Sequence, residues 1–214
     1  SNGSIDGFLL SMAKETELNN KHDHFKESIE NGTPIVMFDR VAKSIECDKV
    51  VTDDLNSAAS TVEFLYKKGH KKIAFISTIS DLHIGEQRLL GYKKGLEKVG
   101  LPFDENLVLN ILERDYKKYV KQVKPFVKDT EIDAVITTGE SVAVSTMKAI
   151  KKSGKKIPKD VAVIAFSNGI LSRHSSPKMT TISQHGEQMG ATAAEILIDK
   201  LKNKNTDIVT KVIK

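Results

Sequence analysis

The amino-acid sequence predicts an α/β protein built on parallel, doubly wound sheets. Apolar runs of strand length alternate with amphipathic helical segments along most of its 214 residues, a pattern typical of repeated βαβ units. The run VAVIAF at 161–166 is apolar without a break, so we expect a strand buried on both faces, as in a parallel sheet. Glycine follows several helical segments at the position where helices end, for instance at Gly69 and Gly154.

The expected elements follow one another along the chain with few exceptions to the alternation. Strands are expected at 5–10, 35–38, 50–52, 73–77, 107–112, 134–138 and 161–166, and a last one begins near Ile208. Helices are expected at 22–31, 55–68, 85–99, 116–128, 141–153 and 187–202. The longer helices carry an apolar face, which Leu55, Ala58, Val62 and Leu65 form on 55–68. Pro125 is expected to kink or divide the helix 116–128.

Composition narrows the class of protein. The net charge of +5 could indicate nucleic-acid binding, but the lysine pairs are spread along the chain, mostly late in helices or just after them. There they complement the helix dipole and keep the surface solvated, an interpretation that we favour over a DNA footprint. The single cysteine, Cys47, cannot form an internal disulfide, which fits a reducing cytoplasm. No apolar run approaches the ~20 residues of a membrane span.

The sequence shows no motif typical of catalysis, cofactor binding or metal binding. It contains neither a glycine-rich phosphate loop nor a G-x-S-x-G nucleophile elbow. His22 and His24 have the spacing of two metal ligands without a third at a useful spacing, so surface histidines are the better interpretation. Asp53 and Asp54 could be paired carboxylates, but Asp54 precedes a helix, where an N-cap role is favoured. We therefore expect no enzyme, no cofactor and no metal site.

Three segments share a pattern, in a fixed order and spacing, with a known family. They are Val51-x-x-Asp54 before a helix; Gly69-His70-Lys71-Lys72-Ile73-Ala74-Phe75-Ile76 followed by Arg88-x-x-Gly91-Tyr92; and Pro158-x-Asp160-Val161-x-Val163-Ile164-x-Phe166 followed by Pro177-x-x-Thr180-Thr181-Ile182-x-Gln184. In these segments the chain resembles the effector-binding domain of the LacI/GalR transcriptional repressors. The resemblance extends over nearly the whole chain.

The resemblance implies a two-lobed, type I periplasmic-binding-protein-like fold with a doubly wound parallel sheet in each lobe. Residues 1–51 plus 184–205 would form the N-terminal lobe, and residues 52–183 plus 206–214 the C-terminal lobe. The segment 1–50 offers two strands and one helix, which is too little to cover both faces of a parallel sheet. We therefore expect an incomplete N-terminal lobe and a DNA-binding headpiece that is absent from this chain.

For function, the resemblance implies the effector-binding domain of a bacterial transcriptional regulator, located in the cytoplasm. A sugar or sugar phosphate would shift the closure of the two lobes and so control the binding of operator DNA by the headpiece allosterically. The alternatives are a periplasmic sugar-binding protein of an uptake system, which shares the fold, and an enzyme. An enzyme would need a convergent acid–base pair, which the sequence does not show.

A homodimer is also implied by the resemblance. The helix 141–153 and the loop 171–179 are similar to the face through which family members dimerise. Val144, Met147 and Met179 could supply an apolar patch there, although the two residues on the helix could equally belong to the core.

Candidate ligand-binding residues lie just after strands, where ligands bind in parallel α/β sheets. They are Glu140, Ser167 and Asn168. The resemblance adds Ser11 and Asp39, which also end strands and match positions that line the family's site, Arg88, as the arginine that grips the effector, and Gln184, at a crossing between lobes. Glu140 could also be only the start of a helix. We expect the seven residues to line one cleft, with Arg88 as the main anchor.

The sequence departs from the family at three places. Gly139-Glu140, Ser167 and Leu55 stand where the family often has Asn-Asp, Asp and Asn. Because fewer carboxylates would face the hydroxyl groups of a sugar, a phosphorylated or otherwise anionic effector is expected to suit Arg88 and Ser167 better than a neutral sugar. Replacing Arg88 by alanine is expected to cost about 2–4 kcal/mol of effector affinity and to leave the fold intact.

Overall fold

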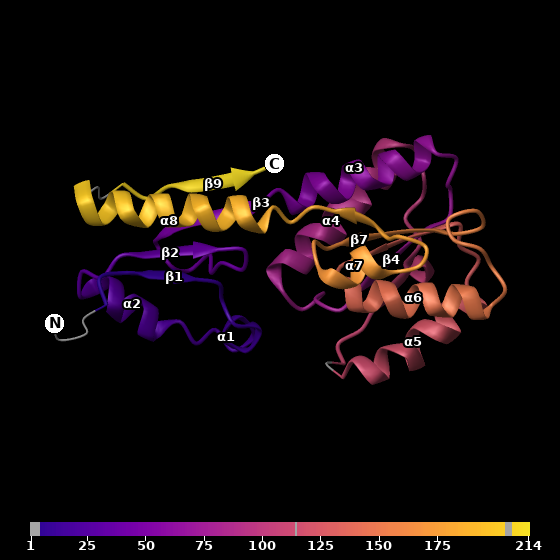
Figure 1. The fold of residues 1–214 in the computed structure, drawn as a ribbon, viewed down its shortest axis with the longest axis horizontal. Coiled ribbons are helices and arrows are strands. Elements are labelled where there is room, and N and C mark those ends of the chain that lie inside the picture. Colours follow the sequence, from indigo (N-terminus) through magenta and orange to yellow (C-terminus); the bar gives the residue numbers. More distant parts are fainter. Residues whose placement is uncertain (1–4, 114, 204–206) are drawn as a thin grey trace. The chain divides into compact units, whose positions relative to one another are not determined.

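The computed structural model describes residues 5–113, 115–203 and 207–214. The chain divides into two compact units (Figure 1). The central unit comprises Asp54–Gln184, and the flanking unit comprises Ser1–Asp53 together with His185–Lys214. Each unit has its own parallel sheet and its own core, so each is described by itself.

Within the described residues, the central unit holds a five-stranded sheet in the order β5-β4-β6-β7-β8. Its strands are β4 (Ile73–Ser77), β5 (Val108–Asn110), β6 (Ala134–Thr137), β7 (Ala162–Phe166) and β8 (Thr180–Ile182). Its helices are α3 (Asp54–Lys67), α4 (His83–Lys98), α5 (Tyr116–Asp129), α6 (Glu140–Lys152) and α7 (Ile170–His174), with the 3-10 turn η1 (Glu105–Leu107) before β5. All its strand pairs are parallel, so the predicted α/β class is confirmed.

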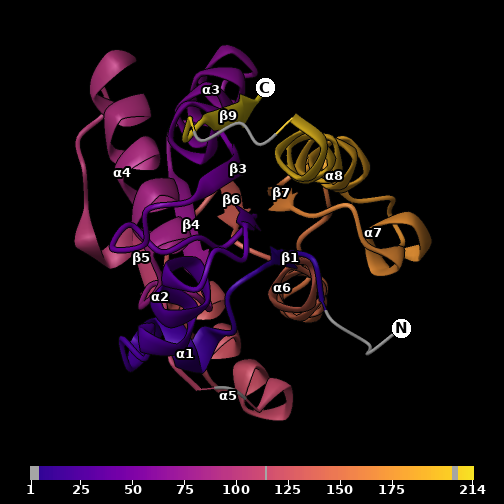
Figure 2. The same cartoon turned by 90° about the vertical axis from the view of Figure 1, so that its left-hand side faces the viewer.

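Helices cover both faces of the central sheet. Successive side chains along a strand point to opposite faces, so each strand contributes to two layers of the core. Phe75 and Ile136 pack against α3 and α4 on one face. Ile76 and Val135 pack against α5 and α6 on the other. Figure 2 shows β4, β6 and β7 with α4 on one side and α6 on the other. Every residue of β4 is buried, which explains why its sequence is nearly all apolar instead of alternating.

The part of the flanking unit that the structure describes contains a four-stranded parallel sheet in the order β1-β2-β3-β9. Its strands are β1 (Phe8–Leu10), β2 (Ile35–Phe38), β3 (Asp48–Thr52) and β9 (Thr210–Ile213), and its helices are α1 (Lys14–Leu18), α2 (Asp23–Glu30) and α8 (Gly186–Asn203). Ile35 and Met37 pack against α2 on one face. Val36 and Val50 pack against α8 on the other. That this unit is incomplete stays a prediction.

Strand β9 belongs to the flanking unit, so the prediction that 206–214 joins the C-terminal lobe is wrong. It runs parallel to β3 and places Lys211 opposite Val50. Asp48, at the start of β3, accepts a hydrogen bond from the backbone N–H of Val209 at 2.8 Å. Lys200 of α8 places its Nζ 3.0 Å from the other oxygen of the same buried carboxylate. Asp48 therefore anchors both α8 and the start of β9 against β3.

Other differences from the sequence prediction concern short elements. Helices α1 and α7 and strand β8 were not predicted, and α7 occupies part of the expected loop 171–179. Pro125 lies within α5, which continues past it, so this proline does not divide the helix. None of the helices in the described ranges is both long enough and apolar enough to cross a bilayer.

Candidate functional site

The order of strands in the central sheet identifies where a ligand would bind. The chain passes from β4 to β5 on one side of β4 and then returns to β6 on its other side. The direction of winding therefore switches between β4 and β6. In open α/β sheets, ligands bind outside the carboxyl ends of the strands at such a switch point. The side chains after Thr137, the last residue of β6, are therefore the first candidates.

Arg88 of α4 reaches this switch point and is almost completely buried, with 2% of its surface exposed. Its Nε donates to Oδ1 of Asp54 at 2.7 Å, and one Nη donates to the carbonyl oxygen of Thr138 at 3.0 Å. The other Nη donates to Oε1 of Gln184 at 2.7 Å. One face of the guanidinium lies 4.1 Å from the ring centre of Phe166. Partners from four different segments therefore fix the side chain in one orientation.

A second polar cluster surrounds Glu140, the first residue of α6. Its Oε2 accepts hydrogen bonds from the hydroxyl of Ser167 at 2.8 Å and from the backbone N–H of Ser172 at 3.3 Å. Ser167 Oγ accepts in turn from the N–H of Gly169 at 2.9 Å. A Cβ at position 169 would lie 2.0 Å from Glu140 Oε1, so only glycine lets the carboxylate approach the loop this closely. Glu140 thus holds the loop after β7 at the carboxyl edge.

Asn168 has a structural role at the same edge. Its Oδ1 accepts from the backbone N–H of Gln184 at 3.0 Å, and its Nδ2 donates to Ser183 Oγ at 3.2 Å. The residue therefore fixes the segment after β8, and with it the side chain of Gln184 that contacts Arg88. Asn168 is itself exposed, and both ends of its amide are engaged within the protein.

The charges of these clusters define the chemistry that the edge offers. The positive charge of Arg88 lies beside the carboxylate of Asp54, whose side chain is 9% exposed. Glu140 adds a second carboxylate near the loop after β7. Hydroxyl, amide and guanidinium groups accompany both, which suits a ligand rich in hydrogen-bonding groups. Within the described ranges, no group of three or more His, Cys, Asp and Glu side chains is arranged to hold a metal ion.

Two candidates lie in the flanking unit, at the carboxyl ends of neighbouring strands. Ser11 follows β1 and Asp39 follows β2, and the Ser11 hydroxyl lies 3.5 Å from Asp39 Oδ2. Asp39 has a φ of +60°, in the left-handed region that non-glycine residues seldom adopt and that is enriched at functional sites. Arg40 Nε lies 4.0 Å from the same carboxylate oxygen. The structure brings these two residues together, and their convergence with the candidates of the central unit stays a prediction.

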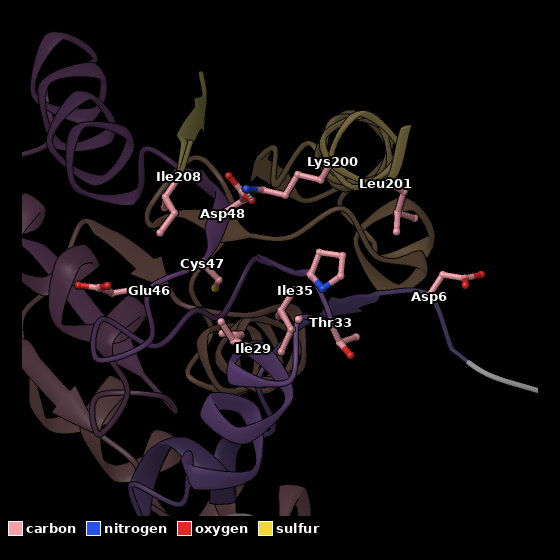
Figure 3. A pocket seen from close by; sticks show the side chains of 12 residues that line it. Asp6, Ile29, Thr33, Ile35, Glu46, Cys47, Asp48, Lys200, Leu201 and Ile208 are labelled. Carbon is pink, nitrogen blue, oxygen red and sulfur yellow. Dashed lines mark ion pairs between the residues drawn. The ribbon is translucent and has the colours of Figure 1, made fainter. Parts of the chain in front are cut away.

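The flanking unit also has a cavity of about 490 Å³, shown in Figure 3. It is lined by Ile35 and Asp48, the first residues of β2 and β3, and by Lys200 and Cys47. Burial raises the pKa of the Cys47 thiol, so this thiol is less reactive than an exposed one. The cavity lies at the amino ends of the strands, whereas Ser11 and Asp39 follow the carboxyl ends. It is therefore separate from the predicted ligand-binding positions.

Sequence reasoning found part of the central cluster and missed part. Arg88, Gln184, Glu140, Ser167 and Asn168 were candidates, and the structure places each at the carboxyl edge. The burial of Arg88 was not predicted, nor were its contacts with Thr138 and Phe166.

Asp54 was interpreted as a helix cap, whereas the structure pairs its carboxylate with Arg88. The signal was present in the segment Val51-x-x-Asp54, but local sequence alone does not reveal a partner 34 positions away.

Comparison with known proteins identifies relatives over almost the whole chain. Residues 62–214 match the family described as periplasmic binding protein-like domain. The HTH-type transcriptional regulator CelR of Thermobifida fusca is 27% identical over 213 residues, which is 98% of this chain and 61% of CelR. Catabolite control protein A of Streptococcus mutans is 33% identical over 174 residues, 80% of this chain and 51% of that protein.

A solved structure agrees with these relatives. The complex of the transcriptional regulator CelR with cellobiose superimposes with a TM-score of 0.83 at 26% identity, covering 99% of this chain and 64% of that one. The chain therefore shares the fold of these regulators and spans less than two thirds of the length of CelR.

Proposed function

We propose that this chain, which belongs to the family of periplasmic binding protein-like domains, is the effector-binding domain of a bacterial LacI-type transcriptional regulator. Its relatives are HTH-type transcriptional regulators, which supports this function over the sugar-uptake alternative. The effector is a sugar or sugar phosphate, and the domain acts by binding, without catalysis. The protein works in the cytoplasm, where its operator DNA is, and a DNA-binding headpiece outside this chain makes the DNA contact.

The arrangement around Arg88 is the observation that carries the proposal. A buried, fully oriented guanidinium at the switch point of a doubly wound sheet is a preorganised set of donors. Ser167 and Glu140 add a hydroxyl and a carboxylate at the same edge. Sugars present many hydroxyl groups, which need such donors and acceptors. The fold is that of a regulator whose structure was solved with cellobiose.

Control of DNA follows from differential binding. An effector shifts a conformational equilibrium only as far as its affinities for the two conformations differ. The domain would thus bind its sugar more tightly in one conformation of the whole regulator and so change the affinity for operator DNA by the same coupling free energy, about 1–3 kcal/mol.

Titration calorimetry with the 214-residue chain tests effector binding directly. We expect saturable binding of one sugar or sugar phosphate per chain. The Kd should lie near the micromolar range, which corresponds to a binding free energy of about −8 kcal/mol. A panel of cellobiose, glucose, ribose and their phosphates gives the first set of probes. If none of these binds at millimolar concentration, the sugar-sensing proposal fails. Mobility shift of operator DNA by the whole gene product, with and without the bound sugar, then separates a regulator from an uptake protein.

The assembly that we propose is a homodimer formed through α6 and α7. Ile170 and Leu171 of α7 are 68% and 43% exposed, and Leu171 and Val144 line a cavity of about 270 Å³ between the two helices. Met147 and Met179 are buried in the core at 4% and 6% exposure, so the expected patch does not include them as surface residues. Exposed apolar side chains beside a hollow are typical of a protein interface.

Replacing Leu171 by aspartate is expected to weaken this dimer by at least tenfold, because a charge would be buried at the centre of the interface. The matched control is Leu90→Asp on α4, where the leucine is 40% exposed and lies on a different surface. Sedimentation equilibrium at micromolar concentration measures both variants. A wild-type monomer, or equal effects of the two substitutions, would contradict the assignment of this face.

A further inference from the structure

We propose that Asp54 makes the central site select neutral sugars over sugar phosphates. The inference rests on the proposed function, since it concerns the effector of the same site. It reverses the expectation drawn from the sequence, in which Arg88 favours an anionic effector. That expectation treated Arg88 as an uncompensated positive charge, whereas the structure pairs it with a buried carboxylate.

The first observation is the closeness of the pair. Arg88 Nε lies 2.7 Å from Asp54 Oδ1, and the two side chains are only 3% and 9% exposed. A phosphate that approached Arg88 would meet the opposing field of the Asp54 carboxylate together with that of the guanidinium. Because water does not separate or screen this buried pair, the two fields cancel to a large extent. The attraction that normally draws phosphate to arginine is therefore mostly lost.

The second observation is the carboxylate of Glu140. Ser167 and the backbone of Ser172 hold it in the loop after β7, directly after Phe166, whose ring covers the guanidinium. The set formed by Arg88, Asp54 and Glu140 carries one positive and two negative formal charges. A phosphate dianion at this edge would meet a net repulsion, while a neutral hydroxyl group would not.

The third observation is what remains of the donor capacity of Arg88. A guanidinium has five N–H donors, and three of them bond to partners in the described part of the chain. The pairing with Asp54 thus removes the net charge and leaves donors in a fixed plane. Sugar hydroxyl oxygens can accept such hydrogen bonds without bringing a charge into the site. Asp54 also fixes the plane of the guanidinium, so it contributes orientation together with charge selectivity.

Matched pairs of probes test the inference on the wild-type chain. Glucose and glucose 6-phosphate, ribose and ribose 5-phosphate, and fructose and fructose 6-phosphate differ within each pair by the phosphate group. Cellobiose serves as a further neutral probe. A thermal-shift screen selects the sugars that bind, and titration calorimetry gives both affinities of each selected pair. We expect the neutral sugar to bind about 30-fold or more tightly than its phosphate.

The variant Asp54→Asn then tests the role of this carboxylate. It keeps the shape of the side chain and removes the charge that opposes Arg88, so the ratio of neutral to phosphorylated affinity should fall about tenfold or more. The control is Asp129→Asn, at the exposed end of α5, which changes the net charge of the chain equally. Its ratio should stay at the wild-type value. If Asp54→Asn does not fold by circular dichroism, the comparison uses Glu140→Gln, which removes the second carboxylate.

The outcomes separate the two proposals. Tighter binding of the phosphorylated member of a pair would overturn the selectivity inference and leave sugar sensing intact. If Asp54→Asn changes the affinity ratio no more than Asp129→Asn does, then Asp54 does not determine the selectivity. Failure of every neutral and phosphorylated sugar to bind would refute the proposed function, and the inference with it.

Discussion

Replacing Arg88 by alanine is expected to lower the free energy of unfolding of the central unit by about 3–5 kcal/mol. The substitution would leave the buried carboxylate of Asp54 without the cation that it pairs with in the wild type. It would also remove donors from the carbonyl oxygen of Thr138 and from Gln184. An unsatisfied buried acceptor costs about 1–3 kcal/mol in itself. We therefore expect Arg88→Ala to weaken the fold, whereas the sequence alone suggested that the fold would stay intact.

Hydrogen exchange followed by mass spectrometry in increasing urea measures this effect in the central unit alone, from the peptides that cover β4 and β6. The control Arg173→Ala removes an exposed arginine of α7 and should change the unfolding free energy by no more than about 0.5 kcal/mol. Arg88→Lys should also destabilise the unit, because an ammonium group cannot reproduce the planar set of hydrogen bonds.

A double variant, Arg88→Ala with Asp54→Ala, distinguishes the lost charge pair from lost packing. Removing both members of a buried pair is expected to cost less than removing Arg88 alone, since no unpaired charge remains. If Arg88→Ala destabilised the unit by less than about 1 kcal/mol, the buried network would not have the energetic role assigned here.

Strands β4, β6 and β7 of the central sheet could be predicted from sequence because nearly all of their residues are buried. Strand β4 has no exposed residue, so its sequence is a nearly unbroken apolar run that is easily recognised. Strand β8 has only three residues, Thr180–Ile182, and two of them are exposed. A short edge strand of this kind lacks both the apolar run and the alternation on which recognition depends. Helix α7 has only five residues, which is too short for an amphipathic pattern to be recognised.

The position of β9 shows a different limit. Its local pattern is compatible with either sheet, and its pairing with β3 and its contact with the buried carboxylate of Asp48 are long-range interactions that this pattern does not reveal. The site shows the same limit. Arg88 could be selected by position and resemblance, but its pairing with Asp54 is a long-range contact, and this contact changes the expected charge of the ligand. Local sequence thus identifies the residues of a site more readily than it identifies their long-range partners, which set the charge and orientation of those residues.

Gly91 gives the second large expected effect, and the structure explains its place in the segment Arg88-x-x-Gly91-Tyr92. In the packing of α4 against α3, a Cβ at position 91 would lie 2.1 Å from the backbone oxygen of Leu55 and 2.9 Å from the Cβ of Ala58. A backbone atom cannot turn away as a side chain can. Gly91→Ala must therefore separate the two helices or shift their register, and it is expected to destabilise the central unit by about 3 kcal/mol. The hydrogen-exchange measurement on β4 and β6 reports this loss as well.

The matched control is Gly190→Ala, in the helix α8 of the flanking unit. A Cβ at position 190 would meet no atom within 4 Å, so only the intrinsic helix propensity changes there. Alanine is preferred over glycine inside a helix by about 1 kcal/mol, so this variant should be slightly more stable than the wild type. Opposite signs for the same chemical change would show that close approach of α3 and α4, and not helix propensity, requires glycine at position 91. A gain in stability for Gly91→Ala as well would mean that the two helices can separate at little cost, and close packing would then not be the reason for glycine at position 91.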